Sequence, residues 1–279
     1  MFNVFAGYMK IAGTMTDKEK HEKRMVLEPR VFDILKEKYL TPLQDFWASY
    51  TVPYDAENRV VIIERRIHPN LEFILYNAAY FARGWGITIV CSDLNKNYIE
   101  SLLKHNLDLV QVITMFEGNP EPSIGKNEYN MLLQSKEFYE ALPSEGLLLM
   151  EMDTYLRKPI DPKILSYDYV ACPYGWDETT SGGGLSFRKK SAMIDICNRY
   201  NQIEAAQDIF ACRGVKALGY SMPPFTDATT YFSESVLYED PVGVHQWWTF
   251  AGLNDPSCPF DEEFFTSLMS LQMYRELPY

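Results

Sequence analysis

The sequence predicts an α/β domain built around a mixed, mostly parallel β-sheet that is flanked by helices. Short apolar runs recur along the chain from residue 59, and they have the composition of buried strands. Stretches with helical spacing of apolar residues lie between these runs, and the connections are long enough for crossovers between parallel strands. This alternation predicts a doubly wound sheet in a single domain.

The expected strands are apolar and short, and turn-forming residues separate them from the helices. These strands lie at residues 59–64, 87–91, 109–114, 146–150 and 167–173. The expected helices have apolar residues spaced three and four apart. These helices lie at residues 71–82, 97–104, 129–142 and 191–200. A loop rich in aromatic and acidic residues is expected from Tyr174 to Ser181. From Tyr220 onward the chain is irregular and aromatic, so no regular element is predicted there.

Residues 1–55 differ from this pattern, and we expect them to form an N-terminal extension that packs on a domain of residues 56–279. The charged run at residues 17–24 predicts a solvent-exposed helix face or a turn. Residues 31–39 predict a short amphipathic helix. Pro42 and Pro53 are expected to end the helical pattern, because proline lacks a backbone N–H and clashes with the preceding turn.

The charge of the chain excludes several classes of partner. A net charge of −12 over 279 residues argues against nucleic acid, whose binding depends on neutralising phosphates. It also argues against an anionic membrane surface. No apolar run reaches the roughly 20 residues of a membrane span, and the N-terminus lacks the pattern of a secretory signal. An anionic nucleotide would need local Arg or Lys side chains or a metal ion.

The five cysteines predict reduced thiols. Their number is odd, their spacing is wide and no C-x-x-C pair occurs, which argues against a disulfide framework and a zinc site. We therefore expect a cytoplasmic protein. Aromatic residues make up 14% of the chain, which suits a carbohydrate or nucleoside site lined by rings and equally suits a large core.

A pair of carboxylates follows the most apolar of the expected strands. Leu147 to Met150 is followed by Glu151 and Asp153, which are two positions apart. Strand side chains alternate, so these two carboxylates are expected on one side, at the edge of the sheet where α/β proteins bind ligands. A hard divalent cation that carries phosphates needs such oxygen ligands. The alternative is a strand end that turns polar as it reaches solvent.

The first expected strand also ends in charged residues, Glu64, Arg65 and Arg66, which could contact a base, a ribose or a phosphate. A surface charge cluster is the alternative. No G-x-G-x-x-G follows this strand, and no G-x-x-x-x-G-K-[ST] occurs. These absences argue against dinucleotide oxidoreductases and P-loop NTPases.

Three further features are candidates for a site. The run of Gly182, Gly183 and Gly184 leads toward Arg188, and glycine lets a backbone pass close to a ligand; a hairpin turn is the alternative. Asp208 lies near the start of an expected short helix and could also be an ordinary surface acid. His245 lies among apolar and aromatic residues, where a core histidine is the commoner interpretation.

Taken together, these segments resemble the DUF5672-type family of GT-A-like glycosyltransferases, which has bacterial, fungal and large-DNA-virus members. The resemblance runs from about Val60 to Trp248 and leaves out residues 1–55. The segments that carry it are Ile63-Glu-Arg-Arg-Ile-His-Pro69, Asn77-Ala-Ala-Tyr-Phe81 with Gly84-Trp85, Tyr129-Asn130-Met-Leu-Leu133 with Lys136-Glu-Phe138, Met152-Asp153-Thr154, Tyr167-Asp-Tyr-Val170, Gly183-Gly-Leu-Ser186 with Arg188, Gln207-Asp208-Ile-Phe210 and Gly243-Val-His245.

The resemblance implies a GT-A-like (Rossmann-like) catalytic domain over residues 56–279. Glu151-x-Asp153 stands at the family's Asp-x-Asp motif, so Asp153 and His245 would bind Mn²⁺ or Mg²⁺. Asp208 would be the base of an inverting transfer, although Gln207 precedes it where an acidic residue is common. Contacts with the nucleotide-sugar donor are expected from Glu64, Arg65, Glu151, Asp153, Gly183, Gly184 and Arg188.

The implied reaction transfers a sugar from a UDP-linked donor to a hydroxyl of a glycan or glycoprotein. Glucose, galactose and xylose all remain open as the sugar, and the oligomeric state is not predicted. Trp176, Trp247 or Trp248 is expected to stack on a sugar face. One alternative is a non-catalytic carbohydrate-binding or assembly module on the same fold. Another is a nucleotidyltransferase, which usually has a glycine-rich basic loop after the first strand; none occurs here.

Overall fold

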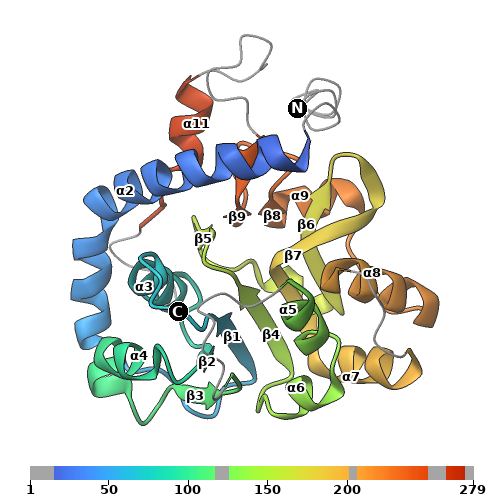
Figure 1. The fold of residues 1–279 in the computed structure, drawn as a ribbon, viewed down its shortest axis with the longest axis horizontal. Coiled ribbons are helices and arrows are strands. Elements are labelled where there is room, and N and C mark those ends of the chain that lie inside the picture. Colours follow the sequence, from blue (N-terminus) through green and yellow to red (C-terminus); the bar gives the residue numbers. More distant parts are fainter. Residues whose placement is uncertain (1–15, 117–125, 201–205, 251–261, 274–279) are drawn as a thin grey trace.

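The computed structural model describes residues 16–116, 126–200, 206–250 and 262–273. Within these residues, six strands form a central sheet in the order β3-β2-β1-β4-β7-β6, and three short strands form a second sheet in the order β5-β9-β8 (Figure 1). Strands β3, β2, β1 and β4 are parallel, whereas β7 and β6 are antiparallel to their neighbours. The predicted mixed, mostly parallel sheet with flanking helices is confirmed.

The strands of the central sheet are β1 (Asn58–Ile63), β2 (Gly86–Cys91), β3 (Gln111–Thr114), β4 (Gly146–Met150), β6 (Tyr169–Tyr174) and β7 (Asp177–Lys189). Those of the small sheet are β5 (Thr154–Leu156), β8 (Phe232–Ser233) and β9 (Gly243–His245). The small sheet begins directly after the Glu151-x-Asp153 segment.

The described helices are α2 (Asp17–Ser49), α3 (Leu71–Phe81), α4 (Lys96–Leu103), α5 (Lys126–Leu132), α6 (Lys136–Glu140), α7 (Lys190–Arg199), α8 (Gln207–Leu218), α9 (Phe225–Tyr231), α10 (Trp247–Phe250) and α11 (Glu262–Leu268). Short 3-10 helices follow α4 and precede β6, at Lys104–Asn106 and Pro162–Ser166. In this part of the chain, no helix combines the length and the apolar character needed to cross a membrane.

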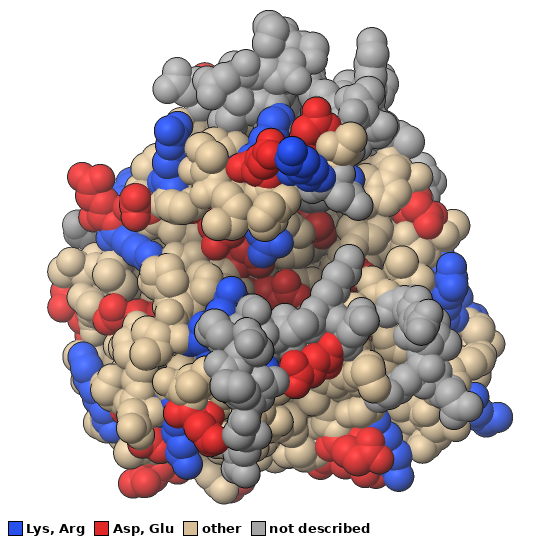
Figure 2. All heavy atoms as spheres, in the orientation of Figure 1, with Lys and Arg blue, Asp and Glu red and all other residues tan. Residues whose placement is uncertain are grey.

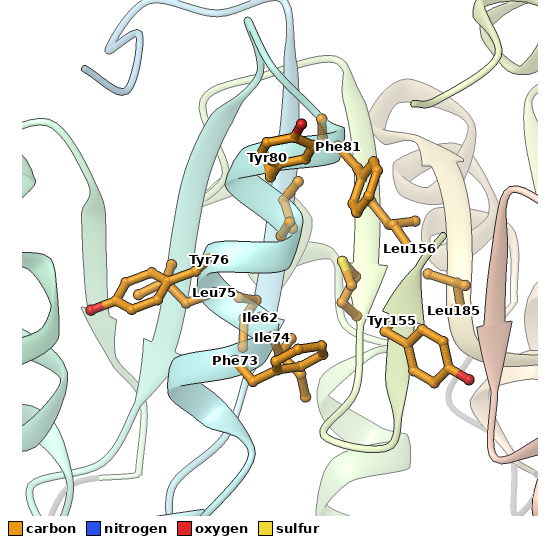
Figure 3. Close-up of a cluster of buried hydrophobic side chains, with 14 of the residues drawn as sticks. Ile62, Phe73, Ile74, Leu75, Tyr76, Tyr80, Phe81, Tyr155, Leu156 and Leu185 are labelled. Atoms are coloured by element: carbon orange, nitrogen blue, oxygen red, sulfur yellow. The ribbon is translucent and has the colours of Figure 1, made fainter. Parts of the chain in front are cut away.

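The central strands are buried on both faces, and alternate residues belong to different cores. Val60 and Ile62 of β1 pack with helices α2 and α3, whereas Val61 and Ile63 pack with α6, α7 and α8. Figure 3 shows part of the first of these cores, in which Ile62 lies beside side chains of α3, and Tyr155 and Leu156 of β5 belong to the same cluster. This two-sided burial explains why the strands read as continuous apolar runs.

Helix α2 is much longer than predicted. The sequence predicts a short helix at residues 31–39 that ends before Pro42, but the helix runs without a break to Ser49. Proline inside a helix costs about 3 kcal/mol. Tyr39, Leu43 and Trp47 are all buried on either side of Pro42, and each such side chain contributes roughly 1.5–3 kcal/mol by leaving water. Packing therefore overrides the local effect of the proline.

Three other local predictions are wrong. The sequence predicts no regular element from Tyr220 onward, but this part of the chain contains helices α9, α10 and α11 and the short strands β8 and β9. The helix predicted at residues 129–142 is divided into α5 and α6, because Ser135 accepts a hydrogen bond from the Phe138 amide and starts a new helix. The sequence also predicts a loop from Tyr174 to Ser181. Most of this loop is instead part of β7, a long strand that contains the three glycines at 182–184.

Candidate functional site

A cavity of about 990 Å³ opens at the carboxyl ends of β1 and β4. Its walls come from segments far apart in the sequence: one face of α2, the residues after β1 and β4, the glycines of β7, the start of α8 and the small sheet. Figure 2 shows a hollow below α2 with acidic side chains inside it. Ligands of open α/β sheets bind at this edge.

The turn after β4 carries both predicted carboxylates into the cavity. Glu151 continues the pairing with β7 by donating its amide N–H to the Gly184 carbonyl at 2.9 Å. The chain then turns into β5, which is anchored to α3 by two hydrogen bonds of 2.8 Å between Asn77 and the backbone of Leu156. Asp153 is buried, and the Glu151 side chain is 29% exposed.

Strand pairing in the small sheet brings His245 to this turn. β9 is antiparallel to β5, and Thr154 is the partner of His245. The Nε2 atom of His245 lies 3.3 Å from Oδ1 of Asp153 and 3.8 Å from Oε2 of Glu151. One ligand atom from each of these three residues lies within 4.8 Å of the others. The predicted metal ligands Asp153 and His245 therefore lie together, with Glu151 beside them.

Glu234 is a fourth member of the site that the sequence does not indicate. Its Oε2 atom lies 3.2 Å from Nδ1 of His245, and its Oε1 accepts a hydrogen bond from Gln246. A carboxylate at one ring nitrogen orients a histidine so that the other nitrogen can bind a metal. The available signal was an acid flanked by serines in an otherwise apolar and aromatic segment, and Glu234 is indeed buried.

These residues fit a divalent metal ion. Both carboxylate oxygens of Asp153, Oε2 of Glu234 and both ring nitrogens of His245 are buried, and among the described residues they are held by ion pairs with one another and with Arg24 and not by well-oriented hydrogen bonds. Such atoms are costly unless a counter-charge or a ligand satisfies them. Carboxylate and imidazole together suit Mn²⁺, and carboxylates also suit Mg²⁺. The observed donor set is consistent with either ion.

The charges in the cluster depend on one another. Burial raises the pKa of Asp153, but Arg24 and His245 outweigh it and hold this pKa well below its usual range. Burial and the neighbouring Asp153 raise the pKa of Glu151. Burial lowers the pKa of His245, yet Asp153 and Glu234 raise it well above its usual value. The carboxylates thus favour a positive charge at this position, which a divalent ion would also supply.

The three glycines make room for the side chains of the site. A Cβ atom on Gly182 would lie 1.9 Å from Oε2 of Glu234. On Gly183 it would lie 2.2 Å from Nε2 of Gln207, and on Gly184 it would lie 2.4 Å from the His245 ring. All three glycines also line the cavity. Contacts within the protein therefore require glycine at these three positions. The run lies in strand β7 and not in the hairpin turn that was the alternative.

We expect Gly184→Ala to damage the candidate metal site by moving the imidazole of His245. Forcing extra atoms into a packed site costs about 1–3 kcal/mol, so the melting temperature should fall, and Mn²⁺ affinity should fall with it. Gly214→Ala in α8 is the matched control, because its Cβ would crowd Ile196 at 2.3 Å, within the apolar packing of α7 and α8. It should lower the melting temperature but leave Mn²⁺ affinity unchanged. Calorimetry measures both quantities, and unchanged Mn²⁺ affinity in Gly184→Ala would contradict this role.

Asp208 lines the same cavity from the first turn of α8. Its Oδ2 atom accepts a hydrogen bond of 2.5 Å from the Tyr174 hydroxyl, and its Oδ1 accepts one of 2.7 Å from the Ile209 amide. A carboxylate is favourable at a helix N-terminus. These contacts fix the orientation of a carboxylate that is only 8% exposed.

Both arginines predicted to contact a donor, Arg65 and Arg188, are buried outside the cavity wall. Arg188 donates hydrogen bonds to Ser186, Tyr139 and Gln207. Arg65 lies 3.4 Å from Glu128 and against the Phe116 ring. Arg188 thereby supports Gln207, the residue next to Asp208. A role of Arg65 and Arg188 in donor binding stays a prediction.

Glu64 does line the cavity, where it forms an ion pair of 2.7 Å with Arg66. The predicted stacking of Trp247 or Trp248 on a sugar is wrong, because both side chains are fully buried in the core. Trp176 is 44% exposed, and its ring stacks on Tyr174, the hydrogen-bond partner of Asp208.

Comparison with known proteins gives a family match and two solved structures. The mouse xyloside xylosyltransferase 1 in its apo form is 9% identical, with a TM-score of 0.44 over 67% of this chain and 97% of that chain. The mannosyltransferase PcManGT from Pyrobaculum calidifontis, in complex with GDP-Man and Mn²⁺, is 13% identical, with a TM-score of 0.42 over 79% of this chain and 66% of that chain. No curated protein matches the chain.

The family model that matches is described as "Protein of unknown function (DUF5672)", and it covers residues 115–245. This range contains Glu151, Asp153, Asp208, Glu234 and His245 and leaves out the whole of α2.

Proposed function

We propose that this chain is a metal-dependent glycosyltransferase of the GT-A type. It would transfer a hexose or pentose from a nucleotide-diphosphate donor, UDP-linked by our expectation, to a hydroxyl of a glycan or glycoprotein. The observation that carries this proposal is the convergence of Glu151, Asp153 and His245 in one cavity with Asp208. That cavity lies at the ligand-binding edge of the sheet.

Asp153 and His245 would hold Mn²⁺ or Mg²⁺, with Glu151 beside them and Glu234 orienting the imidazole ring. When bound, such an ion neutralises the charge that develops on a departing nucleoside diphosphate. The carboxylates around Asp153 would repel the diphosphate, and a bound ion would offset this repulsion. Glu64 lies at the same edge and is available to the donor's ribose or base.

Asp208 would accept the proton of the acceptor hydroxyl as that oxygen attacks the anomeric carbon. Tyr174 holds the carboxylate by donating to Oδ2, and each carboxylate oxygen has a second lone pair for the acceptor. Burial, with Glu234 and Asp208 nearby, raises the pKa of Tyr174, so this hydroxyl keeps its proton and remains a donor. The arrangement favours a single displacement with inversion.

The test is a panel of nucleotide sugars incubated with the protein and Mn²⁺. We expect one donor to raise the melting temperature, since a ligand that binds only the folded state stabilises it, and the same donor to be hydrolysed slowly to sugar and nucleoside diphosphate. UDP-glucose, UDP-galactose, UDP-xylose and a GDP-linked sugar cover the main choices. Sugar binding without turnover would indicate a carbohydrate-binding module. Pyrophosphate release from a nucleoside triphosphate and a sugar phosphate would indicate a nucleotidyltransferase.

A further inference from the structure

Helix α2 is part of the cavity and not only a support for the core. Arg24 and Met25 lie three and four residues after His21, and Glu28 lies four and three residues after them, so these side chains share one face of the helix, and all of them line the cavity. This face lies over the acidic hollow in Figure 2. The N-terminal segment therefore supplies side chains to the site that the DUF5672 match does not cover.

Arg24 reaches from this face to the carboxylate that we assign to the metal. Its Nη2 atom lies 2.5 Å from Oδ2 of Asp153, and its Nε lies 3.4 Å from Glu28. Glu28 accepts a hydrogen bond from Asn70, and Asn70 also donates to the Met152 carbonyl. Arg24 is thus held against Asp153 by contacts that include the backbone of the same turn.

The two partners of this ion pair differ in exposure and in length. The side chain of Asp153 is 2% exposed and fixed in the turn, whereas that of Arg24 is 41% exposed on a long flexible stem. A divalent ion on Asp153 would repel a guanidinium in contact with the same carboxylate. A diphosphate carried by that ion would attract it, and arginine forms paired hydrogen bonds with phosphate oxygens.

We propose that Arg24 competes with the divalent ion for Asp153 and, when the ion displaces it, binds the diphosphate of the donor. This inference rests on the proposed function, because it takes Asp153 as a metal ligand. Helix α2 then links the two binding events: it opposes the binding of metal alone and favours the binding of metal with nucleotide. The two effects of a single side chain have opposite signs, which makes the inference easy to test.

The first measurement is Mn²⁺ binding in the absence of nucleotide, which electron paramagnetic resonance and calorimetry both quantify. Arg24→Gln should raise Mn²⁺ affinity about tenfold, a ratio that corresponds to ~1.4 kcal/mol. Arg30→Gln is the matched control, because Arg30 is exposed on the same helix, does not line the cavity and loses the same charge. It should leave Mn²⁺ affinity unchanged. Equal or weaker Mn²⁺ binding in Arg24→Gln than in the wild type would overturn the inference.

The second measurement is UDP binding at saturating Mn²⁺. Arg24→Gln should now weaken UDP affinity about tenfold, and Arg24→Lys should recover part of it because the charge is kept while the paired geometry is lost. UDP affinity that is unchanged in Arg24→Gln would overturn the second half of the inference. Asp153→Asn distinguishes a failure of the proposed function from a failure of this inference. If Asp153→Asn leaves Mn²⁺ binding intact, the proposed metal site itself is wrong. If Asp153→Asn abolishes Mn²⁺ binding while Arg24→Gln has no effect, only the role of Arg24 is wrong.

Discussion

Asp153→Asn should abolish Mn²⁺ binding and, with it, Mn²⁺-dependent binding of UDP. The substitution keeps the shape of the side chain and removes the charge that faces both His245 and Arg24. In the proposed site Asp153 is one of the two principal protein ligands, so its loss should weaken Mn²⁺ binding by more than the 10–100-fold that is typical of losing a supporting residue. Calorimetry with Mn²⁺ alone, and with UDP and Mn²⁺ together, measures both effects.

Asp108→Asn is a suitable control for this experiment. Asp108 is exposed and precedes β3, so it lies at the edge of the parallel strands opposite to the cavity. His245→Gln should fall between the control and Asp153→Asn in Mn²⁺ affinity, since the carboxylates would remain. If Asp153→Asn kept the Mn²⁺ affinity of the wild type, the buried cluster would be a structural ion-pair network and the metal assignment would be wrong.

The parallel strands could be predicted because their information is local. β1 and β4 are buried on both faces, so each reads as a continuous apolar run whatever packs against it. The end of α2 could not be predicted in this way. Pro42 is a strong local signal for a helix end, and only the burial of Leu43 and Trp47 against the core overrides it.

The site was predictable to the extent that its residues follow recognisable strands. Glu151 and Asp153 follow β4 directly, and their spacing was enough to single them out. His245 depended on a resemblance, because only the pairing of β9 with β5 brings it to the turn. Glu234 had no comparable signal, since its importance comes from a contact with His245 that the sequence does not reveal.

The sequence singles out the glycine run for one reason, and the structure shows a stronger one. A backbone that passes close to a ligand is one use of glycine, and Gly183 and Gly184 do line the cavity. The stronger requirement comes from Gln207 and His245, which occupy the space that side chains on these two glycines would need. That requirement depends on tertiary contacts, which a pattern of glycines alone cannot specify.

Asp208→Asn should reduce turnover by roughly 10²–10⁴-fold and leave donor affinity nearly unchanged, because in the proposed mechanism it removes the proton acceptor and not a donor contact. Tyr174→Phe should have a smaller effect, since it removes one hydrogen bond that orients the carboxylate. Asp227→Asn is the matched control: Asp227 also lies in the first turn of a helix, α9, but it is exposed and outside the cavity. It should leave turnover unchanged. Initial rates with the donor that the nucleotide-sugar panel identifies, together with calorimetry, make the comparison.

The configuration of the product tests the same assignment independently. A base that activates the acceptor hydroxyl for one in-line displacement inverts the anomeric carbon, so an α-linked UDP donor should give a β-linked product. The anomeric proton in the NMR spectrum of the product distinguishes the two configurations. An α-linked product would mean that the sugar is transferred with retention. Asp208 would then serve to stabilise the start of α8 and to accept the hydrogen bond from Tyr174, and it would not be the base that accepts the acceptor's proton.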